Sequence, residues 1–138
     1  GNSTPSGLRE PGASVCNARM QSAKVRILVV GDSGTGKTCI VHRLCHQQIL
    51  RNPRWTVGCA PDVTLYEYSK GNRSVFLEFF DIGGHRNYRM SRDIFYKDIN
   101  GILFTFDVTN RKSYQHLRHW IREISNADKT KGIEEKFM

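Results

Sequence analysis

The chain has 138 residues and a formal net charge of +8, and this length suits one domain with a buried core. Its 21 Lys and Arg residues are scattered without a run of five like charges, which indicates a solvated basic surface and excludes nucleic acid as the expected partner. Its 4 Cys residues form no CxxC pair, so we expect reduced thiols of a cytoplasmic protein and neither a disulfide framework nor a zinc site.

The first 23 residues differ in composition from the rest. They are rich in Gly, Ser, Asn and Pro and have few large apolar side chains, so we expect residues 1–23 to form a disordered arm. From residue 24 to residue 138, strand-like and helix-like segments alternate, which predicts an α/β domain with a mainly parallel sheet and helices on both faces. No segment reaches the roughly 18 apolar residues of a transmembrane helix.

The most informative segment is residues 31–38, GDSGTGKT, which matches the phosphate-binding P-loop pattern G-x-x-x-x-G-K-[ST]. It follows the apolar run 25–30, typical of a buried strand, and precedes the helix-like segment 39–47. Strand, glycine loop and helix together aim backbone N–H groups and the positive end of a helix at a polyphosphate. Lys37 is expected to reach the β- and γ-phosphates, and Thr38 to give its hydroxyl to Mg²⁺. The expected nucleotide-binding residues here are Asp32, Ser33, Gly34, Thr35, Gly36, Lys37, Thr38 and Cys39. The apolar positions expected on the inner side of the helix are Val41, Leu44 and Cys45.

A second group of polar residues lies around the next pair of strands. Segments 63–68 and 75–80 flank the turn-like sequence 69–73 and predict a β-hairpin. Asp81 directly follows the second strand and is expected to hold Mg²⁺ through water, while the Gly84 N–H approaches the γ-phosphate. Thr56 precedes the hairpin in a loop. Its hydroxyl can bind Mg²⁺ only while the γ-phosphate is present, which predicts an order–disorder switch.

The remaining segments predict two helices separated by a strand. Residues 86–97 form the first helix, with Met90, Ile94 and Phe95 on its apolar face and with Arg86, Arg89 and Arg92 at helical spacing. This Arg stripe can be a solvated face or can meet an acidic partner. Residues 101–107 predict a further buried strand. Residues 113–124 predict the second helix, with Ser113 as its N-cap and Leu117, Ile121 and Ile124 as its apolar positions.

Taken together, five pieces of the sequence resemble a Ras-superfamily small GTPase, closest to the Rab-like branch. They are GDSGTGKT, WTVG at 55–58, DIGG at 81–84, FDVTN at 106–110 and Trp120. The resemblance covers about residues 24–124 and implies a P-loop NTPase G-domain of three layers that binds GTP or GDP with Mg²⁺. It implies that Thr38 and Thr56 bind the metal, with Asp81 behind a water molecule.

The same resemblance implies how such a protein works. Residues 47–59 would be switch I and residues 81–96 switch II, which bind effector and regulator proteins. The expected function is a slow GTPase switch in vesicle traffic or signalling, located in the cytoplasm and reaching membranes through partners.

Two departures from the family pattern affect these expectations. His85 stands directly after DxxG, where small GTPases carry a water-orienting Gln, so His85 is expected either to accept a hydrogen bond from water during catalysis or to be an exposed loop residue. The guanine-recognition motif N/TKxD is absent, and residues 126–129 read NADK. We therefore expect residues 24–138 to be a partial domain that lacks its C-terminal part. Its strand at 102–106 would lie at a sheet edge and favour self-association, and the sequence shows no prenylatable C-terminal Cys.

Two functions stay open from the sequence. The intact P-loop Lys and Mg²⁺ ligands favour a GTP-binding switch, whereas the missing base-recognition part favours a degenerate G-domain that acts as an interaction module with little or no turnover. An ATP-binding P-loop enzyme is a poorer third choice, because nothing resembles an ATPase sensor or a kinase lid.

Overall fold

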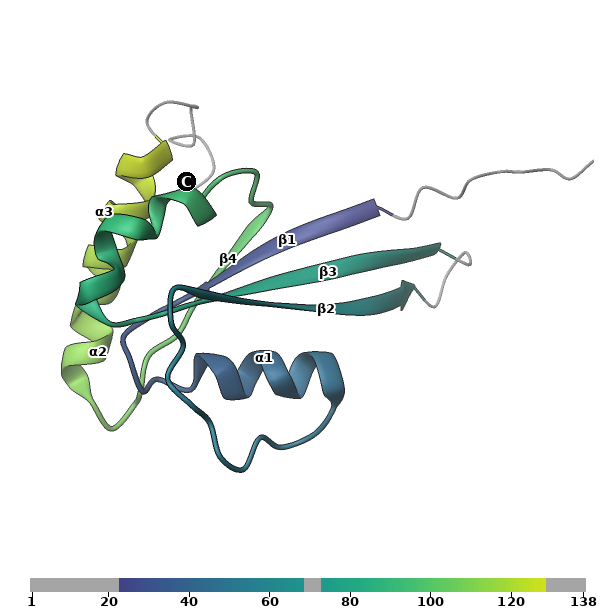
Figure 1. Ribbon diagram of the computed structural model, residues 1–138, viewed down its shortest axis with the longest axis horizontal. Helices are drawn as coiled ribbons and strands as arrows, with labels where there is room; N and C mark the ends of the chain where they lie inside the picture. The colour runs from purple at the N-terminus through teal and green to yellow at the C-terminus, as the bar shows by residue number, and fades with distance from the viewer. Residues whose placement is uncertain (1–22, 69–72, 129–138) are drawn as a thin grey trace, which may run out of the picture.

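The computed structural model describes residues 23–68 and 73–128 (Figure 1). The expected N-terminal arm up to residue 22, the centre of the expected turn at 69–72 and residues 129–138 lie outside the described part. The described elements are β1 (Ala23–Val30), α1 (Lys37–His46), β2 (Cys59–Tyr68), β3 (Arg73–Ile82), the 3-10 helices η1 (Arg86–Ser91) and η2 (Asp93–Phe95), β4 (Gly101–Phe104), α2 (Arg111–Gln115) and α3 (Leu117–Asp128).

The four described strands form one mixed sheet in the order β2-β3-β1-β4. β1 is parallel to both β3 and β4, whereas β2 and β3 are antiparallel and form the predicted hairpin, with Tyr68 opposite Arg73. The sheet is therefore parallel at its centre and mixed as a whole. Among the described strands β4 lies at an edge, as expected for this segment, but it ends at Phe104 and is only partly buried.

Helices pack on both faces of the sheet because side chains alternate along β1. Val29 points to one face, where it joins Val41 of α1 in a buried cluster. Val30 points to the other face and packs with Trp120 and Ile124 of α3. Each buried apolar side chain of this kind contributes about 1.5–3 kcal/mol. Figure 1 shows α1 on one side of the strands and the α2–α3 pair on the other.

The segment 86–97 is not the α-helix that its spacing predicts. It forms η1 and η2, and Met90 and Ile94 are 91% and 62% exposed. Arg92 and Tyr96 take the buried positions instead, at 3% exposure each. The sequence prediction of buried positions in 86–97 considered only apolar side chains and so placed neither Arg92 nor Tyr96 in the core. Arg92 can be buried because an ion pair and an aromatic ring of α3 compensate its charge.

The capping prediction for the last helical segment was also wrong. Asn110 is the N-cap of α2 and accepts a hydrogen bond from the Lys112 N–H over 3.1 Å. Ser113 lies inside α2, fully buried, and its hydroxyl accepts from the Asp107 N–H over 2.9 Å. The segment divides into α2 and α3. Two of the predicted inner positions, Leu44 in α1 and Ile121 in α3, are exposed.

Candidate functional site

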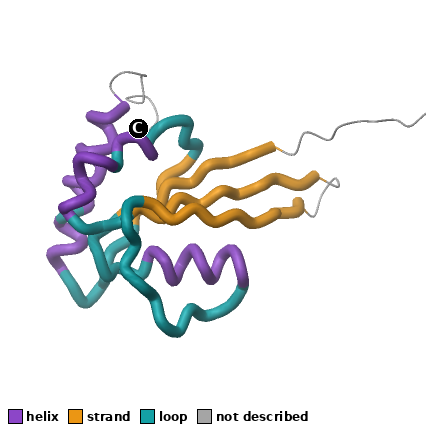
Figure 2. Tube along the Cα trace, in the orientation of Figure 1, coloured by secondary structure: helices purple, strands orange, loops and turns teal. Residues whose placement is uncertain are grey.

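The loop between β1 and α1 turns back through glycine. Gly34 and Gly36 have φ values of 81° and 84°, a left-handed conformation that costs a residue with a Cβ about 1–2 kcal/mol. Gly31 lies against the residue after β4, since a Cβ on Gly31 would be 2.3 Å from the Thr105 carbonyl oxygen. The Thr105 N–H donates to the Val30 carbonyl over 2.8 Å, and Figure 2 shows the loops after β1 and β4 together at one end of the sheet. The two strand ends therefore fix the start of the loop.

Lys37 places a buried cation inside this loop. It is the first residue of α1, is 6% exposed, and its Nζ donates to the Asp32 carbonyl oxygen over 2.8 Å. Burial lowers the pKa of Lys37 from its ordinary value, while the carboxylates of Asp81 and Asp32 act in the opposite direction. A buried ammonium group beside the N-terminus of a helix is stabilised by an anion, and a phosphate group fits this position.

Three side chains from different segments converge next to Lys37. The hydroxyls of Thr38 and Thr56 donate to Oδ2 of Asp81 over 2.5 and 3.0 Å, and the two hydroxyls are 3.1 Å apart. Asp81 is 1% exposed, and its other carboxylate oxygen, Oδ1, has no hydrogen-bond partner among the described residues. A hard cation that keeps some of its water fits such a set of oxygens, because the unpaired oxygen can accept from a bound water.

This oxygen set is too small to hold a metal by itself. Within residues 23–68 and 73–128, His, Cys, Asp and Glu side chains form no group of three or more that could bind a metal ion. A cation between the two hydroxyls and Asp81 would therefore need further oxygens. Phosphate oxygens held by Lys37 would supply them, which ties the metal to the nucleotide.

Gly84 brings the loop after β3 against the glycine loop. A Cβ on Gly84 would lie 2.5 Å from both the Gly31 carbonyl oxygen and the Ser33 nitrogen, so only Gly allows this approach. The next residue, His85, caps η1 by accepting a hydrogen bond from the Asn87 N–H at Nδ1 over 3.3 Å. A neutral His85 then carries its proton on Nε2. In that tautomer the Nε2–H would donate to a water molecule, and the role of His85 toward a catalytic water stays a prediction.

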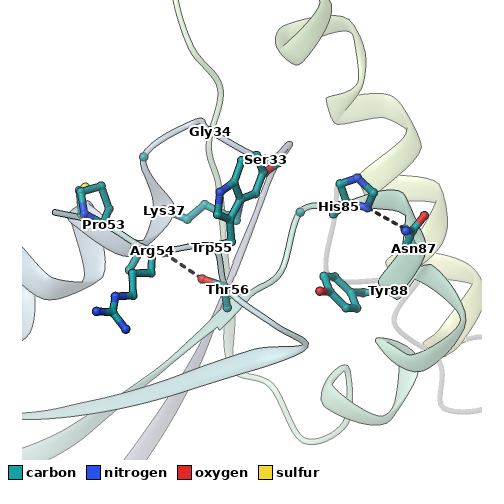
Figure 3. A pocket seen from close by; sticks show the side chains of 14 residues that line it. Ser33, Gly34, Lys37, Pro53, Arg54, Trp55, Thr56, His85, Asn87 and Tyr88 are labelled. Carbon is teal, nitrogen blue, oxygen red and sulfur yellow. Dashed lines mark hydrogen bonds between the residues drawn. The ribbon is translucent and has the colours of Figure 1, made fainter.

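These segments enclose a recess of about 490 Å³ (Figure 3). Trp55 and Arg54 of the loop before β2 add to its lining beside the glycine loop, and His85 and Tyr88 lie on the opposite side in Figure 3. Most of the residues expected to bind the nucleotide line it. They are Ser33, Gly34, Gly36, Lys37, Thr38, Cys39, Thr56 and Gly84, and the expected catalytic residue His85 lines the recess as well.

Asp32 and Thr35, also expected to bind the nucleotide, make other contacts with their side chains. The Asp32 carboxylate accepts hydrogen bonds from Nδ1 of His116 over 2.5 Å and from Nε1 of Trp120 over 3.0 Å. The Thr35 hydroxyl donates to the Asp32 carbonyl and lies 2.9 Å from the Thr105 hydroxyl. Both residues therefore shape the loop, and their partners His116 and Thr105 were not among the site residues expected from the sequence. The i, i+4 spacing of His116 and Trp120 was a usable signal, because it places both on one helical face.

Arg92 connects the loop after β3 to α3. Its Nε lies 3.2 Å from Oε1 of Glu123, its guanidinium stacks 4.3 Å from the centre of the Trp120 ring, and its Nη1 donates to the Gly83 carbonyl over 3.3 Å. Trp120 also holds Asp32 of the glycine loop. One helix thus contacts both loops that border the nucleotide recess.

Comparison with known proteins identifies relatives of the chain. Residues 26–135 match the family model described as "Ras family". The chain is 44% identical over 112 residues to "Rab-like protein 3" of Homo sapiens and 41% identical over 112 residues to that of Danio rerio, which covers 76% of this chain and 48% of each relative. It is 34% identical over 113 residues to "Small GTPase LIP1" of Arabidopsis thaliana, which covers 74% of this chain and 33% of that protein. The chain spans about half the length, or less, of these curated relatives. No helix in its described part has the length and hydropathy for crossing a membrane.

Proposed function

This chain belongs to the Ras family of small GTPases, and on that premise we propose that it is a GTP-binding molecular switch of the Rab-like type with slow hydrolysis. The observation that carries the proposal is the convergence of Lys37, Thr38, Thr56 and Asp81 at one recess. Lys37 and the N-terminus of α1 would bind the phosphates. The two hydroxyls would bind Mg²⁺, with Asp81 accepting from a metal-bound water. Mg²⁺ supplies neutralisation of the phosphate charge.

The switch itself would be residues 47–59. The Thr56 hydroxyl reaches the site through Thr38 and Asp81, and Trp55 and Val57 on either side of Thr56 are 78% and 74% exposed. The ends of this segment are held separately, since the Gln47 N–H donates to the Arg43 carbonyl and the Gly58 carbonyl accepts from the Gly83 N–H. Its middle can therefore be ordered when the Thr56 hydroxyl binds the metal and released when that contact is lost. We therefore propose that effector and regulator proteins bind residues 47–59 and 81–96, in vesicle traffic or signalling in the cytoplasm.

A titration of GTP and of ATP, each with and without Mg²⁺, tests this function. We expect Mg²⁺ to strengthen binding of the triphosphate, and a preference for GTP over ATP would show that residues other than an N/TKxD motif recognise the base. Equal affinity for ATP and GTP would contradict a guanine-specific switch.

One observation favours a second candidate, an interaction module of G-domain type with little or no turnover. His85 is exposed and its Nδ1 is occupied in capping η1, so only one ring nitrogen is free to contact water. Nucleotide binding without measurable hydrolysis, or no binding of either triphosphate, would support this candidate.

Asp81→Asn is expected to weaken the Mg²⁺ dependence of GTP binding. The amide keeps the shape of the side chain but replaces one carboxylate oxygen by a donor, and losing an outer partner of a metal site typically costs about 10- to 100-fold in metal affinity. Mg²⁺ titration of the GTP-loaded protein measures the change. Asp62→Asn is the control, since Asp62 pairs with His46 and lies outside the recess. Equal Mg²⁺ affinity in Asp81→Asn and the parent would argue against the metal site.

His85→Ala is expected to slow hydrolysis and leave nucleotide affinity nearly unchanged. The Nε2–H of His85 would position water, and most of the charge change falls on the γ-phosphate, so the intrinsic rate should be on the order of 10⁻⁴ s⁻¹, as in Ras-type domains without an arginine finger. His85→Gln keeps a donor and should preserve or raise the rate. Single-turnover hydrolysis on preloaded protein measures this step, with His119→Ala as control. If His85→Ala hydrolyses GTP at the parent rate, His85 is only the cap of η1.

A further inference from the structure

A second recess, of about 810 Å³, lies between the segment after β3 and helix α3. It shares Ser33, Gly84 and His85 with the nucleotide recess, so the two hollows meet at the glycine loop. Arg86 and Arg89 of η1 line the new recess from the side of the switch segment. On the other side it is lined by residues of α3, including His119, Trp120 and Arg122.

The acidic residues that line this recess are already satisfied. Asp32 accepts hydrogen bonds from His116 and Trp120. Glu123 accepts a hydrogen bond from Tyr96 over 2.6 Å, and its carboxylate lies 3.2 Å from Arg92 and 3.7 Å from Arg89. Both carboxylates therefore already have partners of their own, although their negative charges remain in the recess.

Two of the lining arginines have no such partner. Arg86 and Arg122 are exposed and form no ion pair or hydrogen bond with any other residue in the described part of the chain. Two arginines without an ion-pair partner at the same hollow contribute a local positive potential, and a concave surface strengthens this field compared with a flat one. Guanidinium groups also bind carboxylates through paired hydrogen bonds.

We propose that this recess binds an acidic segment of a partner protein, with carboxylates on Arg86 and Arg122. The two internal carboxylates of the hollow disfavour a uniform polyanion such as nucleic acid. A peptide, in contrast, can place neutral residues over Asp32 and Glu123 and acidic residues over the arginines. An extended peptide can also follow a recess between two elements, which favours a peptide over a membrane surface.

The inference rests on the proposed function only in that Arg86 belongs to the partner-binding segment 81–96. It adds the chemistry of the partner and extends the surface to α3, beyond both switch segments. Because Gly84 and His85 border both hollows, bound peptide and bound nucleotide would contact the same short segment.

Fluorescence anisotropy with a short labelled peptide of alternating Glu and Ala tests the proposal on the whole chain loaded with GDP. The variant Arg86→Glu/Arg122→Glu should bind the peptide at least about tenfold more weakly than the parent. The control Arg73→Glu/Arg111→Glu changes the same number of charges at exposed arginines outside the recess and outside both proposed switch segments, and should keep the parent affinity. Equal weakening in both variants would overturn the proposal, because it would show a response to net charge alone.

Two further probes, phosphatidylserine vesicles and duplex DNA, distinguish the other partner classes. Binding of either probe that is lost in Arg86→Glu/Arg122→Glu, with peptide binding unaffected, would also overturn the proposal. The GDP affinity of each variant is measured in the same samples and should equal that of the parent. A parent that fails to bind nucleotide would contradict the proposed switch, while the peptide comparison would still decide the inference.

Discussion

Lys37→Ala is expected to abolish GTP binding at concentrations where the parent is saturated. The Nζ of Lys37 is buried, donates to the Asp32 carbonyl and faces the recess with the remaining donor capacity of its ammonium group. Removing one member of a buried charge pair costs about 3–5 kcal/mol, which corresponds to a loss on the order of a thousandfold in affinity. The change should be the largest among the single side chains of the site, because the cation contacts two phosphates.

The same substitution should leave the fold intact and even raise the stability of the nucleotide-free protein. Burial disfavours the charged form of Lys37, which is why its pKa is lowered, so removing the cation relieves a cost in the free protein. In Lys37→Ala, the midpoint temperature of thermal unfolding of the nucleotide-free protein should therefore rise, while the affinity for GTP should fall. Lys112→Ala, on the exposed surface of α2, is the control and should change neither. Parent-like GTP affinity in Lys37→Ala would remove the basis of the proposed function.

Local patterns in the sequence predicted the core of the site and the family. The glycine loop, the strand before it and α1 follow from adjacent residues, because left-handed glycines and the helix start are local properties. The hairpin was predicted for the same reason. The loop motif and the family resemblance placed Thr56 and Asp81 beside Thr38, and the structure brings these three side chains together, while their role as metal ligands stays a prediction. Membership of the Ras family is confirmed.

The contacts of Asp32 could not be predicted in the same way. Its carboxylate is bound by His116 and Trp120, more than eighty residues further along the chain. Such a pairing depends on how α3 packs on the sheet, and no local period encodes it. The burial of Arg92 was not predicted for a related reason. A charged side chain is buried only where distant partners compensate its charge, and here these partners are Glu123 and Trp120.

Gly31→Ala is the second substitution with a large expected effect, and it acts on stability. The φ of Gly31 is 151°, a conformation that residues with a Cβ rarely adopt, and the new methyl group would overlap the backbone carbonyl of Thr105 at 2.3 Å. Thr105 cannot move away freely, because its N–H donates to the Val30 carbonyl where β1 and β4 end. Backbone strain and overpacking together should cost about 3 kcal/mol or more in the free energy of unfolding.

Comparison with Gly34→Ala separates backbone strain from steric overlap as causes of the stability loss expected for Gly31→Ala. The Gly34 φ of 81° is also left-handed, yet a Cβ there would have no atom within 4 Å, so only the conformational cost of about 1–2 kcal/mol remains. Urea denaturation of both variants measures the difference, with an unchanged slope showing that the unfolded states are comparable. We expect Gly31→Ala to lower the midpoint clearly more than Gly34→Ala. Equal losses would mean that the end of β4 yields to the methyl group, and that the contact between Gly31 and Thr105 does not fix the glycine loop.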